Sequence, residues 1–292
     1  MERLANAPPA APPNRLASWQ RWWNKKLGHP STPDVAILAS LITTLQTSAS
    51  QTLAQPITHV AVALPPIPAL AALDVADALE HAGLHHWLGD TRGRQAKHVS
   101  PSSAVFAAHG HGLCVTYPNM HRCWNEEWDM PWRRVLFVSL TRHVLYVSLD
   151  RMKEAFTRFP DDGPMVLDFE GGLDRKGRFA DEDEYWAHVR GQIVTVARRG
   201  ERSVEMVLLG GENATESGFL ETLRDALAEI GAGLLPSVDG GVVVDPTYAA
   251  ARGMALYARR RHEVPGICME LERCEEKRER ERASGGQSRV DL

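Results

Sequence analysis

The sequence has few cysteines, and their positions follow no familiar pattern. Its 292 residues include Cys114, Cys123, Cys268 and Cys274 and no other cysteine. Small secreted proteins that are held together by disulfides are much richer in this residue. The count therefore argues against a secreted disulfide scaffold. It predicts a reducing compartment, with the cytoplasm as the expected location.

The chain also lacks long apolar runs and an excess of charge of one sign. No apolar run reaches the roughly 18 residues that a membrane-spanning helix needs, and the N-terminus does not show the basic-then-apolar order of a signal peptide. The 33 basic and 37 acidic residues give a net charge of -4, which provides no attraction for nucleic acid or an anionic membrane. We therefore expect no membrane span and no nucleic-acid partner, and instead a small-molecule ligand or another protein.

Three well-known catalytic and nucleotide-binding motifs are missing too. The chain contains no Gly-x-Ser-x-Gly elbow, no dinucleotide-binding glycine fingerprint and no P-loop consensus. Their absence excludes assignment to the enzyme classes that these motifs identify. With 43% hydrophobic and 24% charged residues, the chain has the composition of a globular protein, long enough for two domains or one large one.

The clearest pattern lies between Ser203 and Arg261. Residues 204–209 form an apolar run of strand length that ends at Gly210 and Gly211, which predicts a buried strand followed by a tight turn. Apolar residues at helical spacing then predict an amphipathic helix that packs on this strand: Phe219, Leu220, Leu223, Leu227 and Ile230. Asp245 and Pro246 precede a second helix with a small-residue face suited to close approach: Ala249, Ala250, Ala251, Gly253 and Ala255.

This order of strand, glycine pair and two helices resembles the C-terminal end of the actin-like ATPase fold. The resemblance is strongest to the ATPase domain of the seventy-kilodalton heat-shock chaperones and their divergent fungal relatives. In that family the glycine pair lies under the adenosine of the nucleotide, because a turn without side chains lets the backbone approach the ligand. The resemblance implies that Gly210, Gly211 and Glu212 lie near a purine. An ordinary strand-to-helix turn is the alternative explanation.

Earlier blocks stand in the same order as in that family. Asp34 is expected to cap a helix that runs to about Ala54, residues 58–64 predict a strand that ends at proline, and the next helix ends with Gly83 as its cap. Residues 100–108 occupy the place of the family's Glu-Pro-Thr-Ala-Ala-Ala segment, without its glutamate. The resemblance therefore implies an α/β fold of the two-lobed actin-like ATPase (ribonuclease-H-like) type, with a truncated first lobe.

The phosphate-binding parts of that family are altered or missing. Residues 135–140 and 143–149 predict a hairpin that corresponds to the family's second phosphate loop. That loop carries an aspartate and glycines, because phosphates are held by backbone N–H groups. Here Ser139 replaces the aspartate, and the turn with Arg142 and His143 at its tip has no glycine.

Nothing near the N-terminus resembles the first phosphate loop, an aspartate followed by Gly-Thr on an opening hairpin. A sequence cut short ahead of its first residue is one explanation for that gap, and loss of the ATPase function is the other. On the second explanation, we do not expect ATP hydrolysis by the family mechanism. ATP or ADP stays a candidate ligand, and no other cofactor is expected.

Residues 109–132 have the most unusual composition in the chain. They include five side chains that can ligate zinc: His109, His111, Cys114, His121 and Cys123. Their spacings match none of the common paired motifs, so no metal site is assigned. Aromatic and acidic residues in this segment, together with the hairpin tip, predict a ligand pocket, with His121, Trp124, Glu126, Trp128, Arg142 and His143 as its candidates. The alternative is an insertion whose aromatic side chains pack over the domain cleft.

The two ends of the chain differ from the rest. Four prolines among alanines predict a flexible arm before residue 15, and residues 15–27 predict a helix that docks on its own domain through its tryptophans. A basic amphipathic helix that binds a membrane or a partner is the alternative. We expect four parts: the arm and helix at 1–33, a remnant of the first lobe at 34–133, the second lobe at 134–262 and a charged, partly disordered tail at 263–292.

Two functions of different classes follow from these patterns. The first is a degenerate, non-hydrolysing chaperone-ATPase-like protein that binds a ligand or a partner in its interlobe cleft. The second is an enzyme of fungal secondary metabolism that uses the vacated cleft to bind and cyclise a small hydrophobic substrate. The second hypothesis depends on residues 109–132 lining a pocket.

Overall fold

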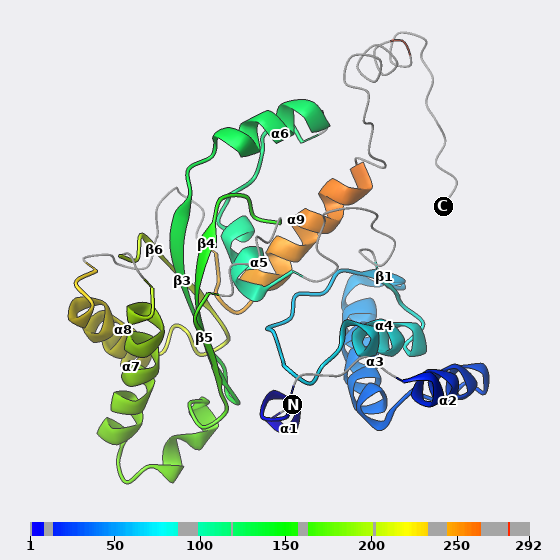
Figure 1. The fold of residues 1–292 in the computed structure, drawn as a ribbon, viewed down its shortest axis with the longest axis horizontal. Coiled ribbons are helices and arrows are strands. Elements are labelled where there is room, and N and C mark those ends of the chain that lie inside the picture. The colour runs from blue at the N-terminus through cyan, green and yellow to red at the C-terminus, as the bar shows by residue number, and fades with distance from the viewer. Residues whose placement is uncertain are drawn as a thin grey trace.

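The computed structural model describes residues 2–8, 14–86, 99–117, 119–156, 163–200, 203–232, 244–263 and 280. The chain forms a mixed α/β structure with a four-stranded sheet and a separate two-stranded sheet (Figure 1). This confirms the α/β class expected from the sequence. Among the described residues, none of the helices is both long and apolar enough to cross a membrane.

The four-stranded sheet has the order β5-β4-β3-β6. Its strands are β3 (Arg133–Leu140), β4 (Leu145–Met152), β5 (Met165–Asp168) and β6 (Met206–Gly210). The first three form an antiparallel meander, and β6 pairs in parallel with β3 on its other side. The strand before Gly210 and the hairpin that the sequence predicts are therefore present, although the hairpin's second strand begins at Leu145 and not at His143.

Helices cover both faces of this sheet (Figure 1). On one face lie α7 (Glu182–Arg198) and α8 (Ser217–Glu229), packed on Leu136, Val138 and Leu140. On the other lie α5 (Pro101–Ala108) and α9 (Ala249–Glu263), packed on Val135 and Phe137. Successive side chains of a strand point to opposite faces. Because both faces of β3 are buried, its sequence is a continuous apolar run rather than an alternating one.

The predicted small-residue face of α9 allows α9 to lie against α5. A Cβ atom at Gly253 would overlap the carbonyl oxygen of Ala104 on α5. The two helices therefore approach each other backbone to backbone, which only glycine permits at this position. The helix α5 lies within the part at 34–133 that the sequence assigns to the first lobe, yet it packs on the same sheet as α9.

The N-terminal part is built around α3 (Pro33–Leu53) and α4 (Ala72–His81), which pack on each other through Val35, Ala39 and Ala78. Asp34 is not the helix cap: the hydroxyl of Thr32 accepts the Val35 N–H at 3.2 Å, and Pro33 occupies the first turn. Asp34 instead pairs with Arg3 of the short helix α1 (Glu2–Ala5), which lies in the arm that we expected to be flexible. Gly83 has a φ of 71° after α4, as a C-terminal cap requires.

The strand predicted over residues 58–64 is much shorter in the structure. In the described part of this region, β1 (His59–Val60) pairs in parallel with β2 (His85–His86) over two residues. Further along, Ala63 makes a single bridge to Val99. Ala61 and Ala63 pack against Val99, Ala104, Met254 and Tyr257, and this apolar contact joins the N-terminal part to the layer of α5 and α9.

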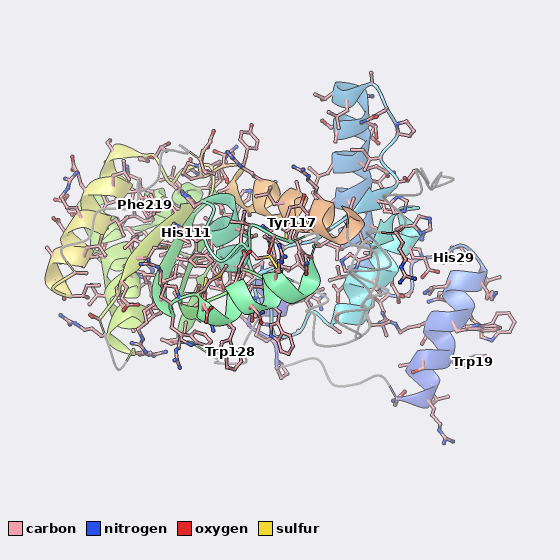
Figure 2. All side chains as sticks on the ribbon, turned by 90° about the horizontal axis from the view of Figure 1, so that it is seen from above. Trp19, His29, His111, Tyr117, Trp128 and Phe219 are labelled. Carbon is pink, nitrogen blue, oxygen red and sulfur yellow. A yellow bond between two sulfur atoms is a disulfide. The ribbon has the colours of Figure 1, made fainter. Side chains whose placement is uncertain are left out.

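The helix α2 (Arg15–Lys26) forms as predicted, but it is not docked through its tryptophans. Trp19, Trp22 and Trp23 are all exposed, and Figure 2 shows Trp19 pointing away from the body of the molecule. Arg21 and Lys25 hold the helix instead, through ion pairs with α4. The tail predicted at 263–292 lies almost entirely outside the described residues.

Candidate functional site

Three turns meet at the edge of the sheet where β3 and β6 end. Because these strands are parallel, with Ser139 beside Gly210, their carboxyl ends lie at the same edge. The β3–β4 turn follows one strand and the Gly211 turn follows the other. The chain before η1 (Leu173–Arg178) completes the group, since Leu173 donates its N–H to the Thr141 carbonyl at 3.1 Å. In open α/β sheets this edge is the usual place for a ligand.

Gly211 has a structural role at this edge. Its φ is 93°, and a Cβ atom there would overlap the carbonyl oxygen of Leu140. The same carbonyl accepts the Asn213 N–H at 3.1 Å, and the Gly211 N–H donates to the carbonyl of Pro246 at 3.1 Å. Close approach of two backbone segments therefore requires glycine here, whether or not a ligand binds.

The N–H groups of the β3–β4 turn are already bonded inside the protein. Glu212 accepts the Arg142 N–H at 2.9 Å, and the hydroxyl of Thr141 accepts the N–H groups of His143 and Val144 at 3.3 and 3.0 Å. The Thr141 N–H donates to the carbonyl of Val144 at 3.0 Å. A phosphate loop must present free N–H groups to its ligand, so this turn is not arranged to hold a triphosphate.

The charged side chains at this edge pair with one another. Arg142 donates from Nε to a carboxylate oxygen of Asp174 at 3.2 Å, and Nδ1 of His143 lies 3.6 Å from the other oxygen of that carboxylate. Both side chains of the hairpin tip are largely exposed. Arg142 is therefore already paired with Asp174, and the carboxylate of Glu212 also lies at this turn.

The candidates on α6 (Met120–Asp129) lie elsewhere. Trp124 is 60% exposed and Trp128 is 72% exposed, so neither lines an enclosed pocket. Figure 2 shows Trp128 at the surface, and the ammonium group of Lys153 lies 5.1 Å from its ring. His121 belongs to α6, but its side chain is outside what the structure describes.

Glu126 supports the local backbone. Its carboxylate accepts the Val115 N–H at 2.6 Å and the Thr116 N–H at 3.3 Å, and it also accepts the Thr116 hydroxyl. The hydroxyl hydrogen bond, together with the two backbone bonds, lowers the pKa of Glu126. This carboxylate therefore holds the chain ahead of α6 and does not face a pocket shared with the tryptophans.

The predicted pocket is thus divided between two places. The helix α6 precedes the first residue of β3, whereas the turn with Arg142 follows its last, and β3 is eight residues long. At about 3.3 Å per residue the two groups are separated by roughly 25 Å along the strand, and Figure 1 shows them at opposite ends of the sheet. The structure does not bring the six pocket candidates together.

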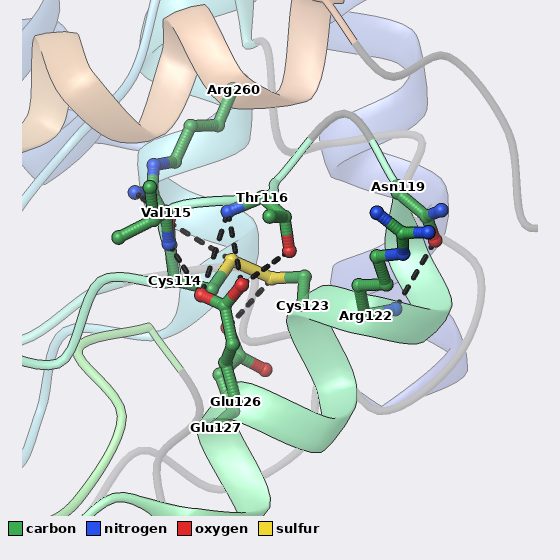
Figure 3. Close-up of a disulfide and its surroundings, with 9 residues drawn as sticks. All are labelled: Cys114, Val115, Thr116, Asn119, Arg122, Cys123, Glu126, Glu127 and Arg260. Atoms are coloured by element: carbon green, nitrogen blue, oxygen red, sulfur yellow. Dashed lines mark hydrogen bonds between the residues drawn. A yellow bond between two sulfur atoms is a disulfide. The ribbon is translucent and has the colours of Figure 1, made fainter.

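One cluster was missed by the sequence reasoning. Cys114 and Cys123 form a disulfide between the chain after α5 and the first turns of α6 (Figure 3), which differs from the thiols expected in a reducing compartment. Arg260 of α9 donates from Nη2 to the Cys114 carbonyl at 2.7 Å and lies over the Tyr117 ring. The two cysteines are nine positions apart in the sequence, and this proximity was the available signal.

Two carboxyl groups stand beside this disulfide. Burial and a hydrogen bond with Glu154 raise the pKa of Glu127 to about 8. The two sulfur atoms and a carboxylate oxygen of Glu127 all lie within 4.8 Å of one another. His109 and His111 are not members of this group; the ring of His111 lies 5.2 Å from that of Phe106, and burial lowers the pKa of His109.

Comparison with known proteins adds no assignment. Neither a protein-family model nor a curated protein matches the sequence. Inferences about function therefore depend on the residues and their geometry.

Proposed function

We propose that the chain is a degenerate, non-hydrolysing relative of the chaperone ATPase domain, which binds a small ligand at the edge where β3 and β6 end. The nucleoside end of a purine nucleotide is the ligand that the resemblance favours, with Gly210 and Gly211 beneath it. The truncated first lobe and the interlobe cleft are parts of the same proposal.

The topology of the large sheet supports this proposal. One lobe of a ribonuclease-H-like fold is expected to begin with an antiparallel meander. A helix, a parallel strand beside the first strand and another helix then follow. The chain follows that order from β3 to α8. The glycine turn and the hairpin tip lie side by side at the edge where β3 and β6 end, which agrees with the resemblance.

The hydrogen bonding of the β3–β4 turn supports the proposal that the protein does not hydrolyse ATP. All four N–H groups from Thr141 to Val144 have acceptors within the protein. A triphosphate with its magnesium ion would have to break these bonds and face Asp174 and Glu212. We therefore infer that binding, where it occurs, is independent of magnesium and is not followed by hydrolysis.

Calorimetry of the full chain with adenosine, ADP and ATP, with and without magnesium, tests the proposal. We expect ADP and ATP to bind with similar affinity and adenosine about tenfold more weakly, because only the nucleotides can accept a hydrogen bond from Arg142. Arg142→Ala should weaken ADP binding about tenfold, the effect of losing one charge-assisted hydrogen bond, and should leave adenosine binding unchanged. Arg224→Ala removes an exposed arginine from α8 and is the matched control. Substitution of Gly211 is unsuitable, because a side chain there would overlap Leu140.

Two results would overturn the proposal. One is the lack of any binding by protein that circular dichroism shows to be folded. The other is magnesium-dependent release of phosphate from ATP, which would mean that the turn opens to accept a triphosphate. The cyclisation alternative is not proposed further, because Trp124 and Trp128 are exposed and lie away from the turns.

A further inference from the structure

The corner between α5 and α6 brings metal-ligand side chains from separate segments together. Cys114 lies after α5, while Cys123 and Glu127 are four residues apart on α6 and so share one helical face. Sγ of Cys123 lies 3.4 Å from Oε1 of Glu127. Glu154, in the chain after β4, makes a hydrogen bond with the Glu127 carboxyl group. Two sulfurs and a carboxylate are ligand types that zinc accepts.

Contacts other than the disulfide hold this corner in shape. The carboxylate of Glu126 accepts two N–H groups from the chain next to Cys114, and Arg260 of α9 donates to the Cys114 carbonyl (Figure 3). The Ala155 N–H donates to the Gly112 carbonyl at 2.9 Å, which ties the chain after β4 to the same place. The ligand side chains would therefore stay close together if the disulfide were reduced.

Burial and charge also suit a divalent cation. Cys114 is fully buried, and Cys123, Glu127 and Glu154 are half-buried. Zinc with two thiolates and one carboxylate carries a net charge of about -1 by formal counting. Nη1 of Arg260 lies 3.7 Å from Sγ of Cys114, so its positive charge would balance that of the complex.

We propose that reduction of the Cys114–Cys123 disulfide by a low-molecular-weight thiol creates a zinc site, with Cys114, Cys123 and Glu127 as ligands and Glu154 or water in the fourth position. Reduction transfers two electrons and two protons to the disulfide, and two thiols of the reductant become a disulfide. Zinc then displaces the protons of the two cysteine thiols. Because the thiolate is the metal ligand, the oxidised form does not bind zinc at the sulfurs.

The disulfide geometry is close to what the metal needs. The Cα atoms of the two cysteines are 5.1 Å apart. Tetrahedral zinc with Zn–S bonds of about 2.3 Å places its sulfurs roughly 3.8 Å apart. Cys123 is the less buried of the two cysteines. Rotation about its side-chain bonds can provide this separation, so the backbone need not rearrange.

Cobalt(II) substitution tests the proposal in the full-length chain. Cys268→Ser and Cys274→Ser leave Cys114 and Cys123 as the sole sulfur pair, and a phosphine reduces them without binding as a thiol would. We expect one cobalt ion per chain, a thiolate-to-cobalt charge-transfer band and the strong visible bands of tetrahedral Co²⁺. Zinc should abolish them. The same protein in its oxidised form should show no charge-transfer band.

Three variants sharpen the ligand set. Cys123→Ser should remove most of the charge-transfer intensity, and Glu127→Gln should weaken cobalt binding by about 10- to 100-fold. Asp129→Asn changes an exposed carboxylate on the same helix and should bind like the parent. The comparison of oxidised with reduced parent protein needs no variant, so it holds even if a substitution impairs folding.

A reduced, folded protein without the charge-transfer band would overturn the proposal. So would Glu127→Gln binding cobalt as tightly as Asp129→Asn, because the third ligand would then lie elsewhere. Metal binding by the oxidised form with the same spectrum would contradict the exclusive relation between disulfide and zinc.

Discussion

The helices α2 and α7 are both docked on the protein, but by different forces. On α7, Tyr185, Val189 and Ile193 are fully buried against the large sheet and α8. On α2 no residue is buried, and Arg21 and Lys25 instead reach Asp74 and Asp77 of α4 at 2.6–3.0 Å. The large sheet therefore depends on removal of apolar surface from water, whereas α2 depends on charge.

This difference predicts which part of the protein responds to pH and salt. Each fully buried apolar side chain contributes about 1.5–3 kcal/mol, and pH and salt change this contribution little. Ion pairs require ionised carboxylates, so they weaken in acid, and salt also screens them, although less when they are partly buried as here. We therefore expect the sheet and its helices to stay folded under conditions that release α2.

Ile193→Ala should have the largest effect, because it removes a fully buried side chain from the α7 interface. We expect a loss of about 2–5 kcal/mol in the free energy of unfolding, measured by urea denaturation. Ile37→Ala is the matched control. Ile37 is 72% exposed on α3, so its loss should change stability by less than about 0.5 kcal/mol. Equal effects would mean that α7 is not held by apolar burial.

Gly253→Ala should come next. The new methyl group would overlap the Ala104 carbonyl and push α9 away from α5, at a cost of about 1–3 kcal/mol. Gly191→Ala is the opposite case. Gly191 lies on the exposed face of α7 with open space around it, so alanine should stabilise the protein by about 0.4–1 kcal/mol. A lower urea midpoint for Gly253→Ala and a higher one for Gly191→Ala, each relative to the parent, would support the close α5–α9 contact. Shifts in the same direction would contradict it.

Asp77→Asn should free α2 without unfolding the sheet. Asp77 is almost fully buried and accepts hydrogen bonds from Arg21 and Lys25, and losing a charged partner costs about 1–3 kcal/mol. Amide hydrogen exchange should show lower protection in α2 and unchanged protection in α7. Glu80→Gln, which removes only an exposed partner of Lys25, should leave the protection of α2 nearly unchanged. Loss of protection in both helices would mean that the two regions unfold together.

Acid should have the smallest effect, and it should be confined to the same helix. Burial opposes ionisation of Asp77, but the hydrogen bonds from Lys25 and Arg21 outweigh it and hold its pKa below the ordinary value of 3.8. A lowered carboxyl pKa contributes stability that is fully present above 3.8 and is lost as the pH falls through the folded-state pKa. As the pH is lowered below 3.8, the hydrogen-exchange protection factors of α2 amides, corrected for the intrinsic exchange rate, should decrease before those of α7. Asp77→Asn should remove the pH dependence.

Local patterns in the sequence determined most of the large sheet and its helices. The strand before Gly210 and the helix with Phe219 and Leu223 depend on apolar spacing within one segment. Such signals act over a few residues, which is why they can be seen without the fold. They also led to the correct α/β class.

Only the tertiary structure decided which segments meet. Arg21 donates a hydrogen bond to Asp77, 56 positions away in the sequence, and Arg260 donates one to the carbonyl of Cys114, 146 positions away. Pairing over such distances depends on how the intervening elements pack, because side-chain type alone does not select one partner among many. By contrast, the order along the chain already placed α6 before β3 and the β3–β4 turn after it, so their separation followed from the length of the strand. The chemistry of each candidate residue was visible from the start, and its neighbours were set by the packing of the sheet.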